Sequence, residues 1–395
     1  MTVHPNTRAV HAGRHDFQTV GVHAPPLDLS STYPLHDPAS AEAAFESFSH
    51  GEVDAREPIY ARLHNPTVAR FEEALAELEG TEAAVAFASG MAALTACLLA
   101  VRSEATDVVA IRPLYGGSDH LLASHLLGLD VRWAEPDAVA SAVGPGTGLV
   151  VLETPQNPTL GVVDIEAVVA AAGAVPVLVD NTFATPVLQN PAAHGAHLVL
   201  HSATKFLGGH GDVVAGAVAC DEAWARRLRQ VRIATGGILH PLAAFLLLRS
   251  LPTLPLRVHE AQRRALELAR RLAGHPQVRH VLYPRGDPLH HQLRGPGAVL
   301  SFEVEGGHEA AAAVMRAVRL VTPAVSLGSC DTLIQHPAGL THRSVDPDAR
   351  EATGITPGLL RLAVGLEDVE DLWLDLEHAL AAARTALRGT HALTG

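Results

Sequence analysis

Between residues 83 and 200, short apolar runs alternate with segments that have the pattern of helices, and this alternation limits the chain to few folds. Short, continuous apolar strands separated by helices are typical of a mainly parallel sheet that is covered on both faces. The predicted strands span 83–88, 108–111, 148–152, 175–179 and 197–200, and the predicted helices span 91–101, 117–127 and 165–172. The predicted fold class is therefore α/β.

The chain divides into three parts by pattern. Its 395 residues are too many for one ordinary core, so we expect two domains. Residues 1–55 show scattered Pro and little sustained helical period, as expected of an arm that lies against another surface. A helix is predicted to begin at Asn65-Pro66-Thr67 and to end near Gly80. From Pro241 the pattern changes to long amphipathic helices at 243–251 and 258–272, followed by a strand at 298–304 and a helix at 369–387. We expect a large domain over 56–240 and a smaller α+β domain over 241–395.

Charge and cysteine content exclude several classes of function. The formal net charge is −13 and no run of Lys or Arg occurs, which argues against binding to nucleic acid or an anionic membrane. Cys97, Cys220 and Cys330 lie far apart, as expected of reduced cysteines rather than of a disulfide or zinc framework. The first residues do not resemble a signal peptide, and charge, Gly and Pro interrupt every apolar stretch of spanning length. The cytoplasm is the expected compartment.

Three features lie at the ends of predicted strands, where open α/β sheets bind ligands. Ala88-Ser89-Gly90-Met91 is a strand-to-helix turn whose backbone amides can approach a phosphate. Asp180 ends an apolar strand; it is either a helix cap or a carboxylate that keeps a pyridine nitrogen protonated.

The third feature is the segment 201–209, His-Ser-Ala-Thr-Lys-Phe-Leu-Gly-Gly. Lys205 follows an apolar strand and precedes a glycine-rich turn, so it is either a surface lysine or a partly desolvated amine that forms a Schiff base. Ser202 and Thr204 flank it with hydroxyls for phosphate oxygens. Together, the acid, the hydroxyls and the amine are far more specific than any one of them, and they favour a pyridoxal-phosphate enzyme.

From about residue 25 to the C-terminal helix, the chain resembles the Cys/Met-metabolism (trans-sulfuration) family of fold-type I pyridoxal-phosphate enzymes. The segments that carry the resemblance are 60–62 (Tyr-Ala-Arg), 65–67, 88–91, 114–117 (Leu-Tyr-Gly-Gly), 153–155 with 157–158, 179–182, the Lys205 block, 325–328, 336–338 with 341–342, and 361–362 with 364–367.

The resemblance implies pyridoxal 5'-phosphate as cofactor and a role for each matching residue. Lys205 would carry the cofactor as a Schiff base and then act as general base, while Asp180 would pair with the ring nitrogen and Tyr115 would stack on the ring. The residues implied in holding the phosphate are Ser89, Gly90, Met91, Ser202 and Thr204. Those implied in binding the substrate are Asn157, Ser326 and Arg361, with Arg361 as the fork for the α-carboxylate.

Tyr60 and Arg62 are implied to reach the phosphate of a neighbouring subunit, with the arm completing that site. The expected assembly is a homo-oligomer, most simply a tetramer built from dimers that share active sites. The expected partner is a small amino-acid substrate, with no nucleic acid and no membrane.

The resemblance implies γ-elimination of cystathionine or methionine to a 2-oxo acid, ammonia and a thiol. γ-Replacement on an activated homoserine shares the same early steps, so the Lys205 block does not separate the two reactions. Gly117 stands where methionine-cleaving relatives carry Cys, whereas residues 334–337, Ile-Gln-His-Pro, resemble those relatives. A binding protein that kept the fold without the cofactor is the non-enzymatic alternative.

Other chemistries are weaker. His194, His197 and His201 have helical ligand spacing, but the run reads as a strand with no carboxylate beside His197 and His201, so no metal site is expected. Ser89 lacks the preceding Gly of a hydrolase nucleophile elbow, and Gly208-Gly209 opens no dinucleotide fingerprint.

Overall fold

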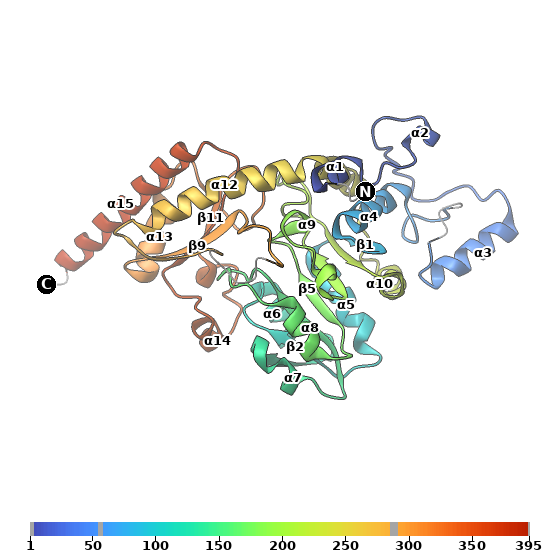
Figure 1. Cartoon of the computed structure of the whole chain (residues 1–395), viewed down its shortest axis with the longest axis horizontal. Coiled ribbons are helices and arrows are strands. Elements are labelled where there is room, and N and C mark those ends of the chain that lie inside the picture. Colours follow the sequence, from blue (N-terminus) through green and yellow to red (C-terminus); the bar gives the residue numbers. More distant parts are fainter. Residues whose placement is uncertain (1–3, 54–57, 285–290, 394–395) are drawn as a thin grey trace.

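The computed structural model describes residues 4–53, 58–284 and 291–393, and it contains a seven-stranded sheet in the order β1-β7-β6-β5-β4-β2-β3 (Figure 1). The strands are β1 (Ala83–Phe87), β2 (Asp107–Ile111), β3 (Asp130–Ala134), β4 (Thr147–Glu153), β5 (Val177–Asp180), β6 (Leu198–His201) and β7 (Gly216–Cys220). All neighbours pair in parallel except β7, which runs antiparallel to both β1 and β6. The expected mainly parallel α/β sheet is confirmed, although β3 and β7 were not predicted.

Helices cover both faces of this sheet. Successive strand residues point to opposite sides, and in these strands the residues on both sides are apolar and need to be buried. In β1, Ala84 and Ala86 enter one apolar core, while Val85 and Phe87 enter another. The helices of this part are α4 (Pro66–Glu79), α5 (Gly90–Arg102), α6 (Gly116–Ala123), α7 (Val139–Ala142), α8 (Ile165–Ala172), α9 (Thr185–Leu188), α10 (Glu222–Thr235), α11 (Pro241–Ser250) and α12 (Leu254–Ala273). The first core packs against α4, α11 and the start of α12, and the second packs against α5 and α10.

Local signals explain where several helices begin and end. Asn65 caps α4 by accepting hydrogen bonds from the amides of Thr67 and Val68, and Pro66 occupies the first turn, as predicted. The helix predicted over 117–127 is shorter, because His125 and Gly128 adopt positive φ angles of 52° and 66° that no helix accommodates.

The C-terminal part forms a second sheet in the order β10-β11-β12-β9-β8. Its strands are β8 (Val278–Leu282), β9 (Val299–Val304), β10 (Thr322–Pro323), β11 (Leu333–Gln335) and β12 (Leu359–Ala363), and its helices are α13 (Gly307–Ala317), α14 (Pro347–Ala352) and α15 (Val369–Leu393). Helix α12 serves both parts: Val258 and Ala261 belong to the core of the large sheet, and Leu268 and Leu272 to that of the small one. The helical pattern changes at Pro241 as expected, but the two cores divide further along, within α12.

The N-terminal arm contains more helix than its pattern indicated. It holds α1 (Pro5–His11), α2 (Phe17–Val20) and α3 (Pro38–Ser49), the last capped by the Asp37 side chain. Ala9 and Ala12 pack into the core of their own chain, whereas α2 and α3 extend away from the sheet (Figure 1). The large apolar side chains that the described part of the arm leaves exposed are Val10, Val20, Leu27, Leu29, Leu35, Phe45 and Val53.

One helical stretch, Pro241–Ala273, is long and apolar enough to span a membrane, contrary to the expectation that no such stretch exists. Half of its apolar window is buried inside the chain, in the cores just described. Because core helices of this kind pass the same test, the stretch is weak evidence for a membrane segment.

Candidate active site

A cavity of about 520 Å³ opens where β4, β5 and β6 end, facing β12 of the smaller sheet. The predicted site residues that line it are Ser89, Gly90, Met91, Tyr115, Asn157, Asp180, Ser202, Thr204, Lys205, Ser326 and Arg361. They come from segments far apart in the sequence, from Ser89 to Arg361, and from both sheets. The structure thus brings together every predicted site residue except Tyr60 and Arg62.

Lys205 presents its amine to the cavity. Its Nζ donates a hydrogen bond to the Ser326 hydroxyl at 2.6 Å. Burial, followed by the positive charge of Arg361, lowers the pKa of the amine to about 8. Near neutral pH an appreciable fraction of the amine is therefore unprotonated and nucleophilic.

Ser326 holds an unusual backbone conformation, with a φ of 97°. Such a conformation is costly for a residue with a side chain, and it persists where the surroundings enforce it. Two residues later, Gly328 packs so closely that a Cβ there would lie 2.6 Å from the Phe206 backbone nitrogen. The segment 326–328 is thereby pressed against the segment that carries Lys205.

Two carboxyl groups, one buried and one partly exposed to the cavity, lie side by side at the ends of neighbouring strands. Asp180 ends β5, and Glu153 is its register partner in β4. Burial raises the pKa of Asp180, and burial together with Asp180 raises the pKa of Glu153 well above its ordinary value. Glu153 was quoted only as part of a family segment; its place at a strand end, like that of Asp180, is the signal that indicates a site residue.

Asp180 has no ion-pair partner among the residues that the structure describes. Its Oδ1 accepts a hydrogen bond from the Thr182 amide at 3.0 Å, and the charge of the carboxylate is otherwise balanced only by more distant groups. A buried carboxylate in this situation favours a cationic ligand. A protonated ring nitrogen fits this requirement.

The start of α5 forms a cradle of backbone and hydroxyl groups. Ser89 caps the helix by accepting a hydrogen bond from the Ala92 amide at 3.1 Å. Gly90 is needed there, because a Cβ would lie 3.0 Å from the Ser202 Cβ. The Thr204 hydroxyl donates a hydrogen bond to the Ala215 carbonyl and accepts one from the Ala215 amide. The Ser202 hydroxyl, in contrast, has no hydrogen-bond partner in the described part of the chain. A helix start with a free hydroxyl suits a phosphate.

Arg361 is almost fully buried and is oriented by Asn157, by the Ser326 carbonyl and by Gln335, whose amide oxygen, in the orientation that its surroundings favour, accepts from the guanidinium at 2.9 Å. Its Nη1 donates to the Asn157 side chain at 2.9 Å, and its Nη2 donates to the Ser326 carbonyl at 2.8 Å. Burial lowers the pKa of the guanidinium to about 10. No carboxylate among the described residues forms an ion pair with it, so a carboxylate ligand would supply the missing counter-charge.

Tyr115 precedes α6, and its amide donates a hydrogen bond to Glu153 at 2.7 Å. Its ring is 40% exposed and lines the cavity. A Cβ at Gly117 would lie 2.6 Å from the ring carbon Cε1, so a larger residue at this position would displace the ring. Gly117 therefore sets where the Tyr115 ring can lie.

Tyr60 and Arg62 lie outside the cavity of their own chain. Arg62 donates to the Ile233 carbonyl at 2.8 Å and stacks over the Tyr60 ring, whose exposed fraction is 45%. Their implied role at the phosphate of a neighbouring subunit stays a prediction.

A buried polar network lies directly behind Asp180. His201 contacts Glu79 at 2.5 Å, and Asn181 donates to the same carboxylate at 2.9 Å; all three side chains are almost fully buried. The expectation that no carboxylate lies beside His201 is therefore wrong: Glu79 comes from α4, more than a hundred residues earlier. His201 is committed to this network.

The α/β fold, the strand-end acid, the desolvated lysine and the cradle at α5 together define a fold-type I pyridoxal-phosphate enzyme. The family model described as "Cys/Met metabolism PLP-dependent enzyme" matches residues 6–381. The chain belongs to this family, which confirms the resemblance and the expected cofactor.

Named relatives are similar along nearly the whole chain. The L-methionine gamma-lyase of Streptomyces avermitilis is 59% identical over 96% of this chain and 89% of its own length. The L-methionine gamma-lyase of Brevibacterium sandarakinum is 53% identical over 98% of this chain and 99% of its own length. Among solved structures, cystathionine gamma synthase from Xanthomonas oryzae pv. oryzae superimposes with a TM-score of 0.88 at 37% identity, covering 98% of this chain and all of that one. Cystathionine gamma lyase from Micromonospora echinospora superimposes with a TM-score of 0.85 at 38% identity, covering 96% of this chain and 99% of that one.

Proposed function

We propose that this chain uses pyridoxal 5'-phosphate to cleave L-methionine at Cγ, with water, into 2-oxobutanoate, ammonia and methanethiol. The observation that carries the proposal is that Lys205 and Arg361 line the same cavity. The chain is also at least 53% identical to two L-methionine gamma-lyases. The cofactor supplies an electron sink that stabilises negative charge at Cα of the bound amino acid.

Lys205 anchors the cofactor and then moves protons. Its lowered pKa makes the amine a base at neutral pH, and the Ser326 hydroxyl holds Nζ at one position. From there the amine would remove the proton at Cα, which makes the Cβ proton acidic. Loss of that second proton leaves the electron pair that breaks the Cγ–S bond, and the departing sulfur takes up a proton to leave as methanethiol. Asp180 keeps the cofactor ring nitrogen protonated, and its raised pKa reflects the buried position that makes this pairing strong.

Arg361 holds the substrate by its α-carboxylate. Asn157 and the Ser326 carbonyl hold two of the guanidinium nitrogens, and the guanidinium lines the cavity, where a carboxylate could accept further hydrogen bonds from it. Ser326 contacts both Lys205 and Arg361, which couples the position of the base to that of the carboxylate clamp.

The mouth of the cavity favours a thioether. Val214, Val325 and Leu340 line it and remain largely exposed in the single chain. The charged residues that line the cavity, among those the structure describes, are Glu153, Asp180, Lys205 and Arg361, and each already has a role at its base. Within the described part of one chain, the distal amino and carboxyl groups of cystathionine would meet no further charged side chain at this mouth, whereas the S-methyl group of methionine would be desolvated against it.

The substrate proposal is tested with purified holoprotein and three substrates: L-methionine, L-cystathionine and O-acetyl-homoserine with and without cysteine. We expect 2-oxo acid from all substrates that undergo elimination, with the highest kcat/KM for methionine. Lys205→Ala is the control and should be inactive with every substrate. A higher kcat/KM for cystathionine, or a thioether product formed faster than 2-oxo acid, would favour cystathionine cleavage or γ-replacement instead. A colourless protein that borohydride does not modify would support a binding protein.

We also propose a cytoplasmic homotetramer whose dimers share active sites. The separation of Tyr60 and Arg62 from their own cavity and the exposed apolar side chains of the arm support the shared site. The three unpaired cysteines support a reducing compartment.

Subunit mixing tests the shared site. Lys205→Ala and Arg62→Ala should each have low activity alone. Mixed through reversible dissociation, they should regain activity, because some sites then contain both native residues. No recovery in a mixture shown to contain hybrids would contradict a shared site.

A further inference from the structure

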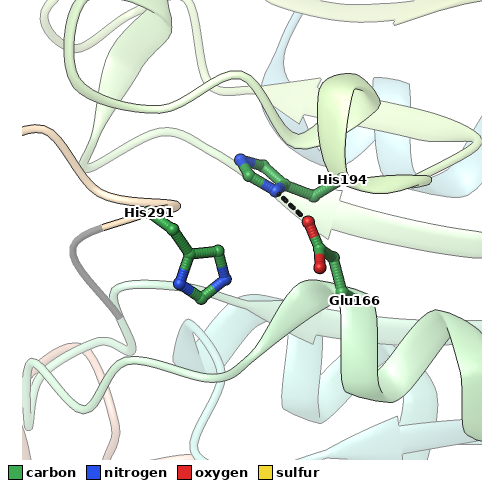
Figure 2. A group of neighbouring side chains, drawn as sticks. All are labelled: Glu166, His194 and His291. Atoms are coloured by element: carbon green, nitrogen blue, oxygen red, sulfur yellow. Dashed lines mark hydrogen bonds and ion pairs between the residues drawn. The ribbon is translucent and has the colours of Figure 1, made fainter. Parts of the chain in front are cut away.

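Three side chains outside the active site, two from the large domain and one from the segment that leads into β9, converge on one spot (Figure 2). They are Glu166 in the first turn of α8, His194 at the end of a short 3₁₀ helix (Pro191–His194), and His291, which precedes β9. Their ligand-type atoms all lie within 4.8 Å of one another. None of the three lines the catalytic cavity.

The backbone around this cluster is held by a buried side chain next to it. Gln292, which is 1% exposed, accepts a hydrogen bond from the Ile165 amide at 3.0 Å and donates to the Val163 carbonyl at 2.9 Å. These two bonds fix the residue after His291 to the residue before Glu166. The approach of His291 to Glu166 is therefore built into the fold and does not depend on two free surface side chains meeting.

His194 is also oriented in advance. Its Nδ1 lies 2.8 Å from the Glu166 carboxylate, and its side chain is only 14% exposed. The His291 ring stands edge-on to the His194 ring, with 5.8 Å between centroids. Two imidazoles and one carboxylate facing a common point from three segments are a typical ligand set for zinc.

We propose that Glu166, His194 and His291 bind a divalent transition-metal ion of the Zn²⁺ type, with water completing the coordination. Bonds of about 2.0–2.1 Å in a tetrahedral site place ligand atoms roughly 3.4 Å apart. The Glu166–His194 pair is already closer than this, so the ion requires a small outward shift of that pair and a rotation of the exposed His291 ring. Imidazole and carboxylate ligands select Zn²⁺ over Mg²⁺ or Ca²⁺, which prefer oxygen alone.

The consequence of binding is mechanical. The ion would join α8 and the 3₁₀ helix of the large domain to the segment that leads into β9 of the smaller sheet. It would then raise the resistance of the native state to unfolding, because the unfolded chain does not hold the three ligands together. It would not change the chemistry in the cavity.

The test uses chelator-treated, pyridoxal-phosphate-loaded protein without a histidine tag, titrated calorimetrically with ZnCl₂. We expect one saturable site per chain and a Zn²⁺-dependent rise in Tm in wild type, and both should be lost in His291→Ala and in Glu166→Gln. His280→Ala is the matched control. His280 also contacts a carboxylate, that of Glu303, at 3.3 Å, but it does not belong to the group of Glu166, His194 and His291. That variant should keep the site and the rise in Tm.

Activity toward methionine verifies that each variant is folded, since none of the substituted residues contacts the cavity. Weak, non-saturable binding in wild type would overturn the proposal, as would an equal stoichiometry and Tm response in wild type and His291→Ala. A visible spectrum with Co²⁺ provides a second readout: a d–d band that Glu166→Gln alters would support the assignment, and an unaltered one would contradict it.

Discussion

Replacing Arg361 by Lys tests the substrate clamp, because it keeps the charge and removes the fork. In the native chain, Asn157 and the Ser326 carbonyl orient the guanidinium, which lines the cavity and can donate to a carboxylate there. A lysine ammonium has no planar fork and cannot satisfy both protein acceptors and a bidentate carboxylate in the same geometry. The variant should therefore bind every amino-acid substrate more weakly.

The magnitude follows from the hydrogen bonds that are lost. One hydrogen bond to a charged group contributes about 1.5–3 kcal/mol, which corresponds to a roughly 10- to 150-fold change in binding. The α-carboxylate does not react, so the clamp acts on the ground state and the transition state alike. We expect KM for methionine to rise by this factor, with a much smaller change in kcat.

The assay is steady-state formation of 2-oxo acid from methionine, with cofactor absorbance as a check that the site is intact. Arg350→Lys is a suitable control, because Arg350 donates to the Ala338 carbonyl and lies outside the catalytic cavity. An unchanged KM in Arg361→Lys would refute the clamp, and a loss confined to kcat would indicate a role in the chemical step instead.

Three further predictions follow from the geometry. The amine of Lys205 must be neutral to capture the cofactor, so capture by cofactor-free protein should speed up with rising pH and level off above pH about 8; a rise that continues unchanged to pH about 10 would contradict the lowered pKa. Glu79→Gln removes a buried charge from the network behind the site and should lower the free energy of unfolding in urea by about 1–3 kcal/mol; an unchanged midpoint would show that the charge is dispensable. Gly117→Ala should displace the Tyr115 ring and lower kcat/KM, whereas Gly237→Ala, where an added Cβ meets only ordinary contacts, should not.

The sequence indicates those parts of the site that depend on local order. The ends of short apolar strands place Asp180 and Lys205 at one edge of a parallel sheet, because the carboxyl ends of such strands meet there. The strand-to-helix turn at 88–91 and the start of α4 at Pro66 also follow from neighbouring residues alone. These expectations agree with the structure.

Contacts between distant segments are not contained in local patterns. The pairing of Glu153 with Asp180 depends on the register between β4 and β5, and that of His201 with Glu79 joins residues 122 positions apart. The insertion of β7 between β1 and β6 likewise reflects packing of the whole sheet. Only the resemblance to a family, not periodicity or spacing, indicated that Arg361 would meet Asn157.

The continuity of α12 determines how the molecule can deform. One uninterrupted helix supplies Val258 to the core beneath the large sheet and Leu268 to the core beneath the small sheet. Rotation of one domain against the other would have to bend α12 or remove the side chains at one of its ends from their core. The cavity floor and the Arg361 wall therefore behave as parts of a single rigid frame, and heating should melt both domains in one calorimetric transition rather than two.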